Sequence, residues 1–257
     1  MHILVTNDDG VHAPGLLALA QAMQLFGSIT VLAPDRNWSA SGHVKTMHRP
    51  LRLKPTTLDD GTPALACDGA PSDCVAMATL GAIPDRIDLV VSGINPHANM
   101  GNDVTYSGTV TAAMEAVIGG LPGLAFSLAA EDDAPHQYYA TAAYVAQRVV
   151  HTLLQQGSLQ PDMLLNVNVP NLPIHELQGL FVTRQGTRVY RDALDHRMDP
   201  RGRSYYWIGG DMPTGVPDEG TDFGAIARNC VSITPLHLDM TAYRQASILG
   251  AWDWNEA

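Results

Sequence analysis

The sequence predicts an α/β protein built around a mostly parallel β-sheet. Over the first 170 residues, short apolar runs rich in Val, Ile and Leu alternate with segments of helical periodicity. An apolar run, a helical segment and a second apolar run fit within residues 2–33, which is the pattern of a βαβ unit with parallel strands. The chain has 257 residues, of which 46% are hydrophobic and 16% charged, so it is expected to fold around a sizeable core.

The elements of this core are expected in a regular order. A strand over residues 2–6 ends at a polar break, and a helix over residues 15–26 has Pro14 in its first turn and Gly27 after its end. A second strand over residues 28–33 stops at Pro34. Further helices are expected over residues 73–80, 108–118 and 138–155, and further strands over residues 88–92, 123–128 and 163–169.

The character of the sequence changes after residue 170. Residues 171–235 contain short β-like pieces, at 180–183 and 204–208, among many Gly, Pro and Arg residues. A returning strand is expected over residues 232–234 and a closing helix over residues 241–252. We therefore expect one domain over residues 1–257, with an α/β core over about 1–170 and, over about 171–257, a β-hairpin extension, a returning strand and a C-terminal helix.

A cluster of arginines falls within this extension. Three aspartates lie between the arginines, so a solvated hairpin whose charges pair with one another is the favoured interpretation. A loop that reaches toward an anionic substrate is the alternative. The arginines are Arg184, Arg188, Arg191, Arg197, Arg201 and Arg203, and the aspartates are Asp192, Asp195 and Asp199.

Charge and cysteine content limit the classes of partner and compartment. The net charge of −11 is spread over both halves of the chain, which argues against a binder of duplex nucleic acid. A phosphate-bearing ligand would then need a local positive charge, such as a metal cation. Three cysteines without a C-x-x-C motif suggest buried free thiols. With no long apolar run and no signal-like N-terminus, a cytoplasmic protein without a membrane partner is expected.

Oxygen-bearing side chains follow three of the predicted strands. Asp8 and Asp9 come directly after the first strand, Ser39 follows the second, and Asn95 follows the strand over residues 88–92. Ligands of parallel α/β sheets bind at the carboxyl ends of the strands, and Mg²⁺ and Mn²⁺ prefer carboxylate, amide and hydroxyl oxygens. Asp8, Asp9, Ser39 and Asn95 could therefore hold one such cation. The alternative is that Asn7-Asp8-Asp9-Gly10 is an ordinary turn.

A predicted helix start provides a candidate phosphate site. Ser107, Gly108 and Thr109 open the helix over residues 108–118, where backbone N–H groups and the helix dipole favour an anion. An ordinary Ser N-cap without a ligand is the alternative. Among the scattered histidines, His97 is the best placed to act as an acid or base, because it lies in the loop after the strand over residues 88–92. For any single histidine, however, a structural role is more common. Trp38 could stack on a base or simply pack.

Four ordered motifs resemble the SurE family, the stationary-phase survival proteins that act as nucleoside 5′-monophosphate phosphatases. Three segments further along the chain also resemble this family. The four motifs are residues 3–10 with Pro14-Gly15, residues 34–37 with Ser39, residues 92–95 with 99–101, and residues 106–110 with 112–115. The later segments are residues 165–170, 183–186 and 234–236.

The resemblance implies a Rossmann-like three-layer core and one divalent cation per subunit, Mg²⁺ or Mn²⁺. It also implies homodimers or homotetramers that exchange the β-rich extension and the C-terminal segment. The metal ligands it carries over are Asp8, Asp9, Ser39 and Asn95. Two residues next to the site depart from the family pattern. His97 stands where the family usually has Gly, and Trp38 stands where it often has a small or basic residue. Asn37, Trp38 and His97 are therefore expected near the substrate.

The expected reaction is metal-assisted release of phosphate from nucleoside monophosphates by water. Asn99 with Ser107, Gly108 and Thr109 would bind the phosphate, and Asp8 or Asp9 would orient or deprotonate the water. Direct attack by one of these carboxylates is the less favoured route. The expected activity is that of a 5′-nucleotidase, with 3′-nucleotidase and exopolyphosphatase activities left open. The alternatives are a metal-dependent nucleotidyl- or glycosyl-transferase, a non-catalytic nucleotide-binding protein, and a structural oligomer with an empty turn.

Overall fold

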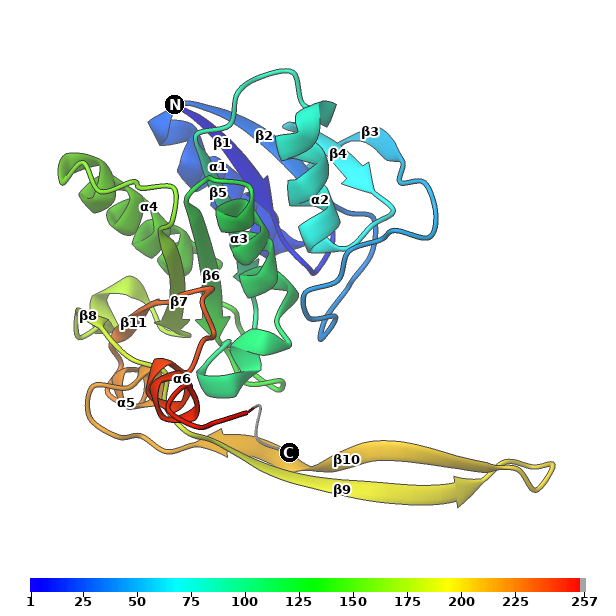
Figure 1. Ribbon diagram of the computed structural model, residues 1–257. Helices are drawn as coiled ribbons and strands as arrows, with labels where there is room; N and C mark the ends of the chain where they lie inside the picture. The colour runs from blue at the N-terminus through cyan, green and yellow to red at the C-terminus, as the bar shows by residue number, and fades with distance from the viewer. Residues whose placement is uncertain (255–257) are drawn as a thin grey trace.

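The core of the structure is a nine-stranded sheet with helices on both faces (Figure 1). The computed structural model describes residues 1–254, except for the side chains of residues 211–213. The strands lie in the order β3-β4-β2-β1-β5-β6-β7-β11-β8. Their bounds are β1 (His2–Thr6), β2 (Ser28–Pro34), β3 (Leu53–Thr57), β4 (Pro63–Cys67), β5 (Leu89–Asn95), β6 (Gly123–Ala129), β7 (Leu164–Pro170), β8 (Leu180–Val182) and β11 (Val231–Pro235).

The central strands, from β4 to β7 in the sheet order, all pair in parallel. Two strands nearer the edges are antiparallel to their neighbours, β3 to β4 and β11 to β7, whereas β8 runs parallel to β11. The expected α/β class with a mostly parallel, Rossmann-like sheet is therefore confirmed.

The strand order reverses between β1 and β5. The chain passes from β1 outward to β2 on one side and from β5 outward to β6 on the other. Crossovers that leave two neighbouring strands in opposite directions open a crevice at the carboxyl ends of those strands, which is where open α/β sheets bind ligands. The loop after β1 carries Asp8 and Asp9, and β5 ends at Asn95, so the topology places these side chains at the crevice.

Apolar side chains of β1 point to both faces of the sheet, and helices cover each face. Ile3 and Val5 belong to one buried apolar cluster, whereas Leu4 belongs to another. Side chains of a strand alternate between the two faces of its sheet, so β1 is buried on both. The first cluster includes α1 (Pro14–Met23) and α4 (Tyr139–Gln155), and the second includes α2 (Pro71–Met77) and α3 (Gly108–Ile118). This arrangement gives the three layers that were expected.

Several boundaries differ from the sequence-based prediction. A 3-10 turn, η1 (Gln24–Phe26), continues α1, and a π-turn, η2 (Ala78–Ala82), continues α2. Strand β5 runs on to Asn95, three residues beyond its predicted end. Strands β3 and β4 were not predicted, because β3 is an edge strand with Pro55 at its centre and little apolar periodicity.

The chain beyond residue 170 contributes to the core sheet and also forms an arm. Strands β9 (Arg188–Met198) and β10 (Ser204–Gly215) pair antiparallel as a long hairpin that extends away from the body (Figure 1). The expected pairing of its charges is confirmed in part, with Arg197 on Asp195 at 2.7 Å and Arg203 on Asp199 at 3.0 Å. Arg188 pairs instead with Asp103 of η3 (Gly101–Thr105), at 2.8 Å.

The remaining elements after β7 are short. They are η4 (Ile174–Glu176), α5 (Asp222–Ile226) and α6 (Tyr243–Leu249), and α6 is shorter than the closing helix expected over residues 241–252. The 3-10 helix η3 (Gly101–Thr105) lies earlier in the chain, before α3. In the described part of the chain, no helix combines the length and apolar character needed to cross a membrane.

A buried carboxylate joins the base of the arm to the core. Asp222 has no exposed surface, and its Oδ2 accepts a hydrogen bond from the backbone N–H of Gly101 at 2.8 Å. Its Oδ1 accepts from the N–H groups of Gly186 and Phe223, each at 2.8 Å. One side chain thus holds together η3, the segment before β9, and α5.

Replacing Asp222 with Ala is expected to lower the free energy of unfolding by roughly 3 kcal/mol or more, because three backbone N–H groups lose their acceptor in a buried place. Asp222→Asn keeps one carbonyl acceptor and should cost less. Urea unfolding of the native protein, Asp222→Asn and Asp222→Ala measures the free energies of unfolding, which should fall in that order. Asp192→Ala, on exposed β9, is the control and should change the free energy of unfolding by no more than about 0.5 kcal/mol. An Asp222→Ala protein as stable as the control would contradict the prediction.

Candidate functional site

The loop after β1 is a tight turn held by its own polar groups. The Asn7 side chain is fully buried, donates from Nδ2 to the carbonyl of Gly10 at 3.0 Å and accepts from the Gly10 N–H at 3.2 Å. Gly10 has a φ of +105°, and a Cβ there would lie 3.3 Å from the backbone of Arg36. Residues 7–10 therefore form a turn held by Asn7, and this turn presents Asp8 and Asp9.

Asp8 is held against the beginning of α3. Its carboxylate Oδ1 accepts a hydrogen bond from the Thr109 hydroxyl, and the residue is 4% exposed. A Cβ on Gly108 would lie 2.7 Å from the Asp8 Cβ, so only glycine allows this close approach. Burial raises the pKa of Asp8, and the Thr109 hydroxyl with the backbone N–H groups of Gly108 and Thr109 partly offsets that increase.

The start of α3 therefore already faces an anion, the carboxylate of Asp8. Ser107 acts as an ordinary N-cap, because its hydroxyl oxygen accepts from the N–H of Val110 at 3.1 Å. Direct contact of Ser107, Gly108 and Thr109 with phosphate stays a prediction. What the structure shows is that Gly108 and Thr109 position and electrostatically stabilise Asp8.

Asp9 differs from Asp8 in having no hydrogen-bond or ionic partner among the described residues. Burial and the neighbouring charge of Asp8 raise the pKa of Asp9 to about 7. Burial, followed by the charge of Asp9, also raises the pKa of the Tyr139 hydroxyl at the start of α4. Two adjacent, largely buried carboxylates without a cationic side chain leave negative charge that a bound cation would neutralise.

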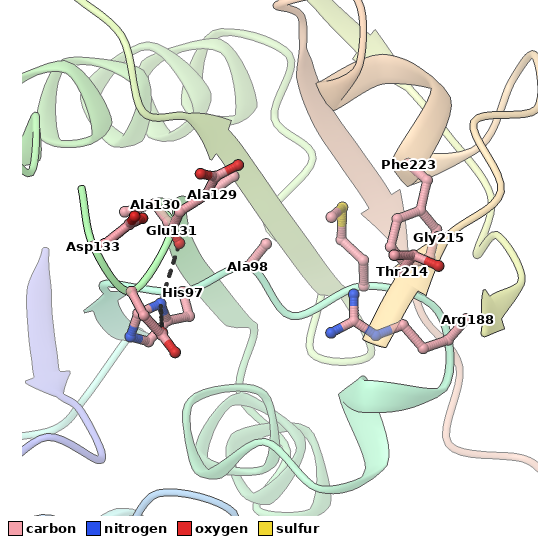
Figure 2. A pocket seen from close by; sticks show the side chains of 12 residues that line it. His97, Ala98, Ala129, Ala130, Glu131, Asp133, Arg188, Thr214, Gly215 and Phe223 are labelled. Atoms are coloured by element: carbon pink, nitrogen blue, oxygen red, sulfur yellow. Dashed lines mark hydrogen bonds and ion pairs between the residues drawn. The ribbon is translucent and has the colours of Figure 1, made fainter. Parts of the chain in front are cut away.

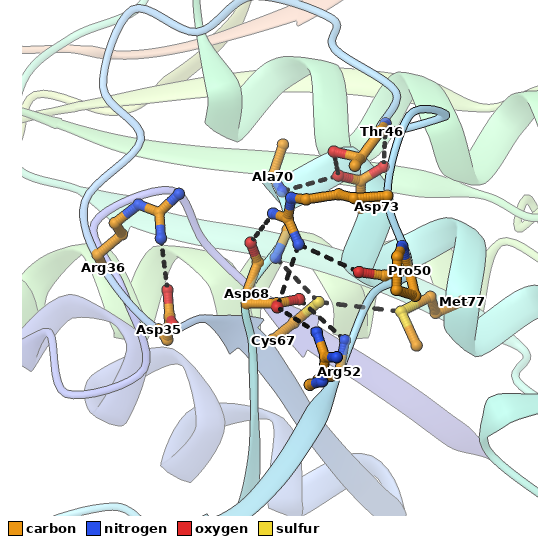
Figure 3. Close-up of polar contacts among 12 residues, drawn as sticks. Asp35, Arg36, Thr46, Pro50, Arg52, Cys67, Asp68, Ala70, Asp73 and Met77 are labelled. Carbon is orange, nitrogen blue, oxygen red and sulfur yellow. Dashed lines mark hydrogen bonds and ion pairs between the residues drawn. The ribbon is translucent and has the colours of Figure 1, made fainter.

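The loop after β2 crosses next to Asp8. The backbone N–H of Trp38 donates to the carbonyl of Asp8 at 2.7 Å, which fixes the two loops together. Ser39 is exposed, and its N–H donates to Oδ1 of Asn37 at 2.6 Å. The guanidinium of Arg36 lies 4.8 Å from the centre of the Trp38 ring and also pairs with Asp35 at 3.4 Å (Figure 3).

Buried carboxylates on two helices anchor the chain that follows Ser39. Asp73 of α2 accepts from the N–H of Thr46 at 2.8 Å and from the Thr46 hydroxyl at 2.6 Å (Figure 3). Glu115 of α3 binds His43 Nε2 and Lys45 Nζ, each at 2.9 Å. The sequence by itself does not indicate that Asp73 and Glu115 anchor this loop, because their partners in it lie 27 to 72 residues away in the chain.

Asn95 ends β5 with its amide group oriented by the same loop. Its Nδ2 donates to the carbonyl of His97, and the residue is 9% exposed. No hydrogen bond in the described part of the chain engages its Oδ1, so this carbonyl oxygen is available as a ligand. His97 turns away toward the loop after β6, where Nδ1 lies 3.1 Å from the carbonyl of Ala130 and 3.6 Å from Oδ1 of Asp132.

Asn99 is fixed by polar side chains of β6 and β7. Its N–H donates to Oδ1 of Asn168 at 2.8 Å, and its Nδ2 donates to the Ser127 hydroxyl at 2.8 Å. The side chains of Asn166 and Asn168 donate to its carbonyl at 2.7 and 3.1 Å. The sequence did not indicate this support, although Asn166 and Asn168 alternate with apolar residues in a predicted strand.

The donor set fits a hard cation. Asp8, Asp9, Ser39 and Asn95 offer carboxylate, hydroxyl and amide oxygens from three loops at the crevice, and Mg²⁺ and Mn²⁺ take such ligands. Within residues 1–254, no cluster of three or more His, Cys, Asp or Glu side chains could hold a metal ion. A cation at this site would therefore need the Ser and Asn oxygens besides the two carboxylates.

The fold and site together define a class: a Rossmann-like α/β protein with paired carboxylates at the point where the strand order reverses. The family profile described as "Survival protein SurE" matches residues 3–192. The chain therefore belongs to the SurE family.

Full-length relatives and a solved structure agree with this assignment. A protein of Herpetosiphon aurantiacus named "5'-nucleotidase SurE" is 52% identical over 257 residues, covering 100% of both chains. A protein of Chloroflexus aggregans with the same name is 50% identical and covers 99% of this chain and 100% of its own. The crystal structure of the Sure protein from Aquifex aeolicus superposes with a TM-score of 0.80 at 38% identity, covering 97% of this chain and 98% of that one.

Asp9→Asn is expected to stabilise the metal-free protein above about pH 7. In the folded state the pKa of Asp9 is about 7 rather than its ordinary 3.8, so the unfolded chain loses this proton first as the pH rises. Asp9 thus reduces stability increasingly between about pH 4 and pH 7, and Asn cannot ionise. In thermal unfolding with EDTA at pH 8, the melting temperature of Asp9→Asn should be higher than that of the native protein. This difference in melting temperature should shrink toward pH 5.

A matched control is Asp59→Asn, in the exposed turn between β3 and β4. It should leave the melting temperature nearly unchanged at both pH values. A difference between Asp9→Asn and the native protein that is independent of pH would contradict the argument.

Proposed function

We propose that this chain is a divalent-metal-dependent phosphomonoesterase that releases phosphate from nucleoside 5′-monophosphates. The single observation that carries the proposal is the pair of adjacent carboxylates, buried Asp8 and partly buried Asp9, with no cationic partner among the described residues. Relatives that are 50–52% identical over their full lengths carry the name 5′-nucleotidase, which supports the same activity here. Activity on 3′-nucleotides and on polyphosphate is left open.

Asp8, Asp9, Ser39 and Asn95 would hold one Mg²⁺ or Mn²⁺ per subunit. When bound, such a cation supplies polarisation of the phosphoryl oxygens and makes water a stronger nucleophile near neutral pH. The chain's own contribution is to preorganise the ligands. Thr109 fixes the Asp8 carboxylate, and the N–H of Trp38 holds the carbonyl of the same residue.

The remaining groups of the site would act either on the attacking water or on the phosphate. Asp9 has no hydrogen-bond or ionic partner in the described structure, so the carboxylate oxygen that does not hold the cation would orient the attacking water and accept its proton. Asn99 Nδ2 and the positive end of α3 would stabilise the non-bridging oxygens of the phosphate. Direct attack by an Asp oxygen on phosphorus is the alternative route. Attack by water is favoured because Asp8 and Asp9 would be metal ligands and therefore weaker nucleophiles.

Asp8→Asn and Asp9→Asn are each expected to lower kcat/KM for adenosine 5′-monophosphate by roughly a hundredfold or more, because each removes a charge that binds the cation or accepts the proton. Released phosphate is measured with Mg²⁺, with Mn²⁺ and with EDTA. Asp59→Asn is the control and should retain native activity. Full metal-dependent activity in Asp9→Asn would contradict the proposed role of this residue.

The same assay separates the other candidate functions. A nucleotidyl- or glycosyl-transferase would consume a sugar nucleotide with an acceptor and leave simple monoesters intact. A non-catalytic nucleotide-binding protein would bind the nucleotide without releasing phosphate. A structural oligomer with an empty turn would show no change in melting temperature on addition of Mn²⁺.

We also propose that the chain works as a homodimer or homotetramer. The hairpin and α6 leave large apolar side chains exposed in the single chain, including Trp207, Ile208 and Tyr243. Exposed apolar surface of this kind marks association sites, and a second copy that exchanges its arm and C-terminal segment would cover it. Light scattering should give a mass of two or four chains, whereas a monomer at micromolar concentration would contradict the proposal.

The proposed location is the cytoplasm. Cys67, Cys74 and Cys230 are all free and buried in the structure, which suits a reducing compartment.

A further inference from the structure

A cavity is lined by the loop that follows Asn95, and Figure 2 shows the side chains around it. It encloses about 750 Å³, which is within the range of small-molecule sites. Three parts of the chain line it: the loop after β5, the loop after β6, and the base of the arm with α5. The function proposed above accounts for the phosphate of a nucleotide and does not use this cavity.

The cavity and the proposed metal site share one loop. His97 and Ala98 line the cavity, and they lie between Asn95 and Asn99 in the sequence. Asn95 donates to the carbonyl of His97, so the loop that presents the candidate metal ligand also forms the cavity wall. If the phosphate of a ligand lies at Asn95 and Asn99, the part of the ligand without the phosphate would therefore lie next to this cavity.

The wall beside this loop is rich in hydrogen-bond acceptors. Glu131, Asp132 and Asp133 line it, and Figure 2 shows Glu131 and Asp133 on the same side as His97. Two contacts fix this wall to the loop after β5, from the N–H of Ala130 to the carbonyl of Pro96 at 3.2 Å and between His97 Nδ1 and the carbonyl of Ala130 at 3.1 Å. A carbonyl oxygen only accepts, so His97 Nδ1 donates in this contact.

The opposite wall is apolar and firmly held. Phe223 and Met100 line it, and the Arg188 guanidinium lies 5.7 Å from the centre of the Phe223 ring. Arg188 Nε is 2.8 Å from Oδ2 of Asp103, close enough for an ion pair although the angles do not make a hydrogen bond. The Asp222 contacts described above fix Phe223 and η3 in place. Because Arg188 already has a carboxylate partner, it leaves little positive charge for a second phosphate.

We infer that this cavity holds the nucleoside half of the substrate, with Glu131 and Asp133 accepting hydrogen bonds from the ribose hydroxyls. The inference rests on the proposed function, since it places the phosphate at the carboxylate site. Carboxylates accept and do not donate, and a vicinal diol offers two donors at the spacing of one carboxylate group. The flat base then lies against the apolar wall formed by Met100 and Phe223.

Charge distinguishes this occupant from other phosphate compounds. Three carboxylates repel additional phosphates, so the cavity suits the uncharged end of a monophosphate. Trp38 was the other candidate for stacking on a base. The Arg36 guanidinium lies over its ring, and Trp38 does not line the cavity.

The experiment compares two substrates in the Mn²⁺-loaded full-length protein. Adenosine 5′-monophosphate has the ribose hydroxyls, and p-nitrophenyl phosphate lacks them. The double substitution Glu131→Gln with Asp133→Asn keeps the shape and removes the charged acceptors. It should raise KM for the nucleotide about tenfold with little change in kcat, and it should leave KM for p-nitrophenyl phosphate unchanged.

Three comparisons keep the test specific. Asp162→Asn, on the exposed segment before β7, should change neither KM. The native preference for adenosine 5′-monophosphate over its 2′-deoxy analogue should shrink in the double variant. An unchanged KM for the nucleotide, or an equal rise for both substrates, would overturn the inference, as would a rise seen only in Trp38→Leu.

Calorimetric binding of adenosine 5′-monophosphate separates this inference from the proposed function. If phosphate is released from neither substrate, the phosphatase proposal fails. The cavity assignment would still stand if the native protein bound the nucleotide about tenfold more tightly than the double variant. Equal binding by the two proteins would overturn it.

Discussion

The contact between the Asp8 carboxylate and the beginning of α3 is the interaction on which the rest of the site depends. It joins the end of β1 to a helix about 100 residues later, and it requires a glycine at position 108 and a hydroxyl at position 109. The Asp8 carbonyl also holds the loop that carries Ser39. Burial raises the pKa of Asp8, and these contacts offset part of that increase. A hard cation would bind the oxygens of this fixed, buried carboxyl group at the crevice.

Other carboxylates in the structure act as anchors for loops. Asp222 holds three backbone N–H groups, Asp73 holds the chain around Thr46, and Glu115 binds His43 and Lys45. Each is buried and satisfied by several donors, which is the condition under which a buried charge can be kept. Part of the net charge of −11 is thus structural. Lys45, one of only two lysines in the chain, is bound to Glu115 and is part of the same anchoring.

The candidate site was predictable from the sequence to the extent that its residues follow strands. A parallel sheet brings the ends of β1, β2 and β5 to one edge, so the order of strands and polar loops along the chain is enough to group Asp8, Asp9, Ser39 and Asn95. Their supporting contacts could not be predicted in the same way. Ser127, Asn166 and Asn168 support Asn99 across 28 to 69 residues of chain, and such pairings depend on register rather than on local pattern.

The sequence by itself determined the βαβ alternation, the buried strands, the turn at Asn7 and Gly10, and the hairpin of the arm, since each depends on local periodicity, turn chemistry or neighbouring charges. Only the tertiary structure decided that β3 and β4 extend one edge of the sheet and that β11 and β8 extend the other. It also decided that the start of α3 contacts Asp8, and that Asp222 fixes one wall of a cavity. These features join segments far apart in the chain, and their geometry exists only when the whole sheet has formed.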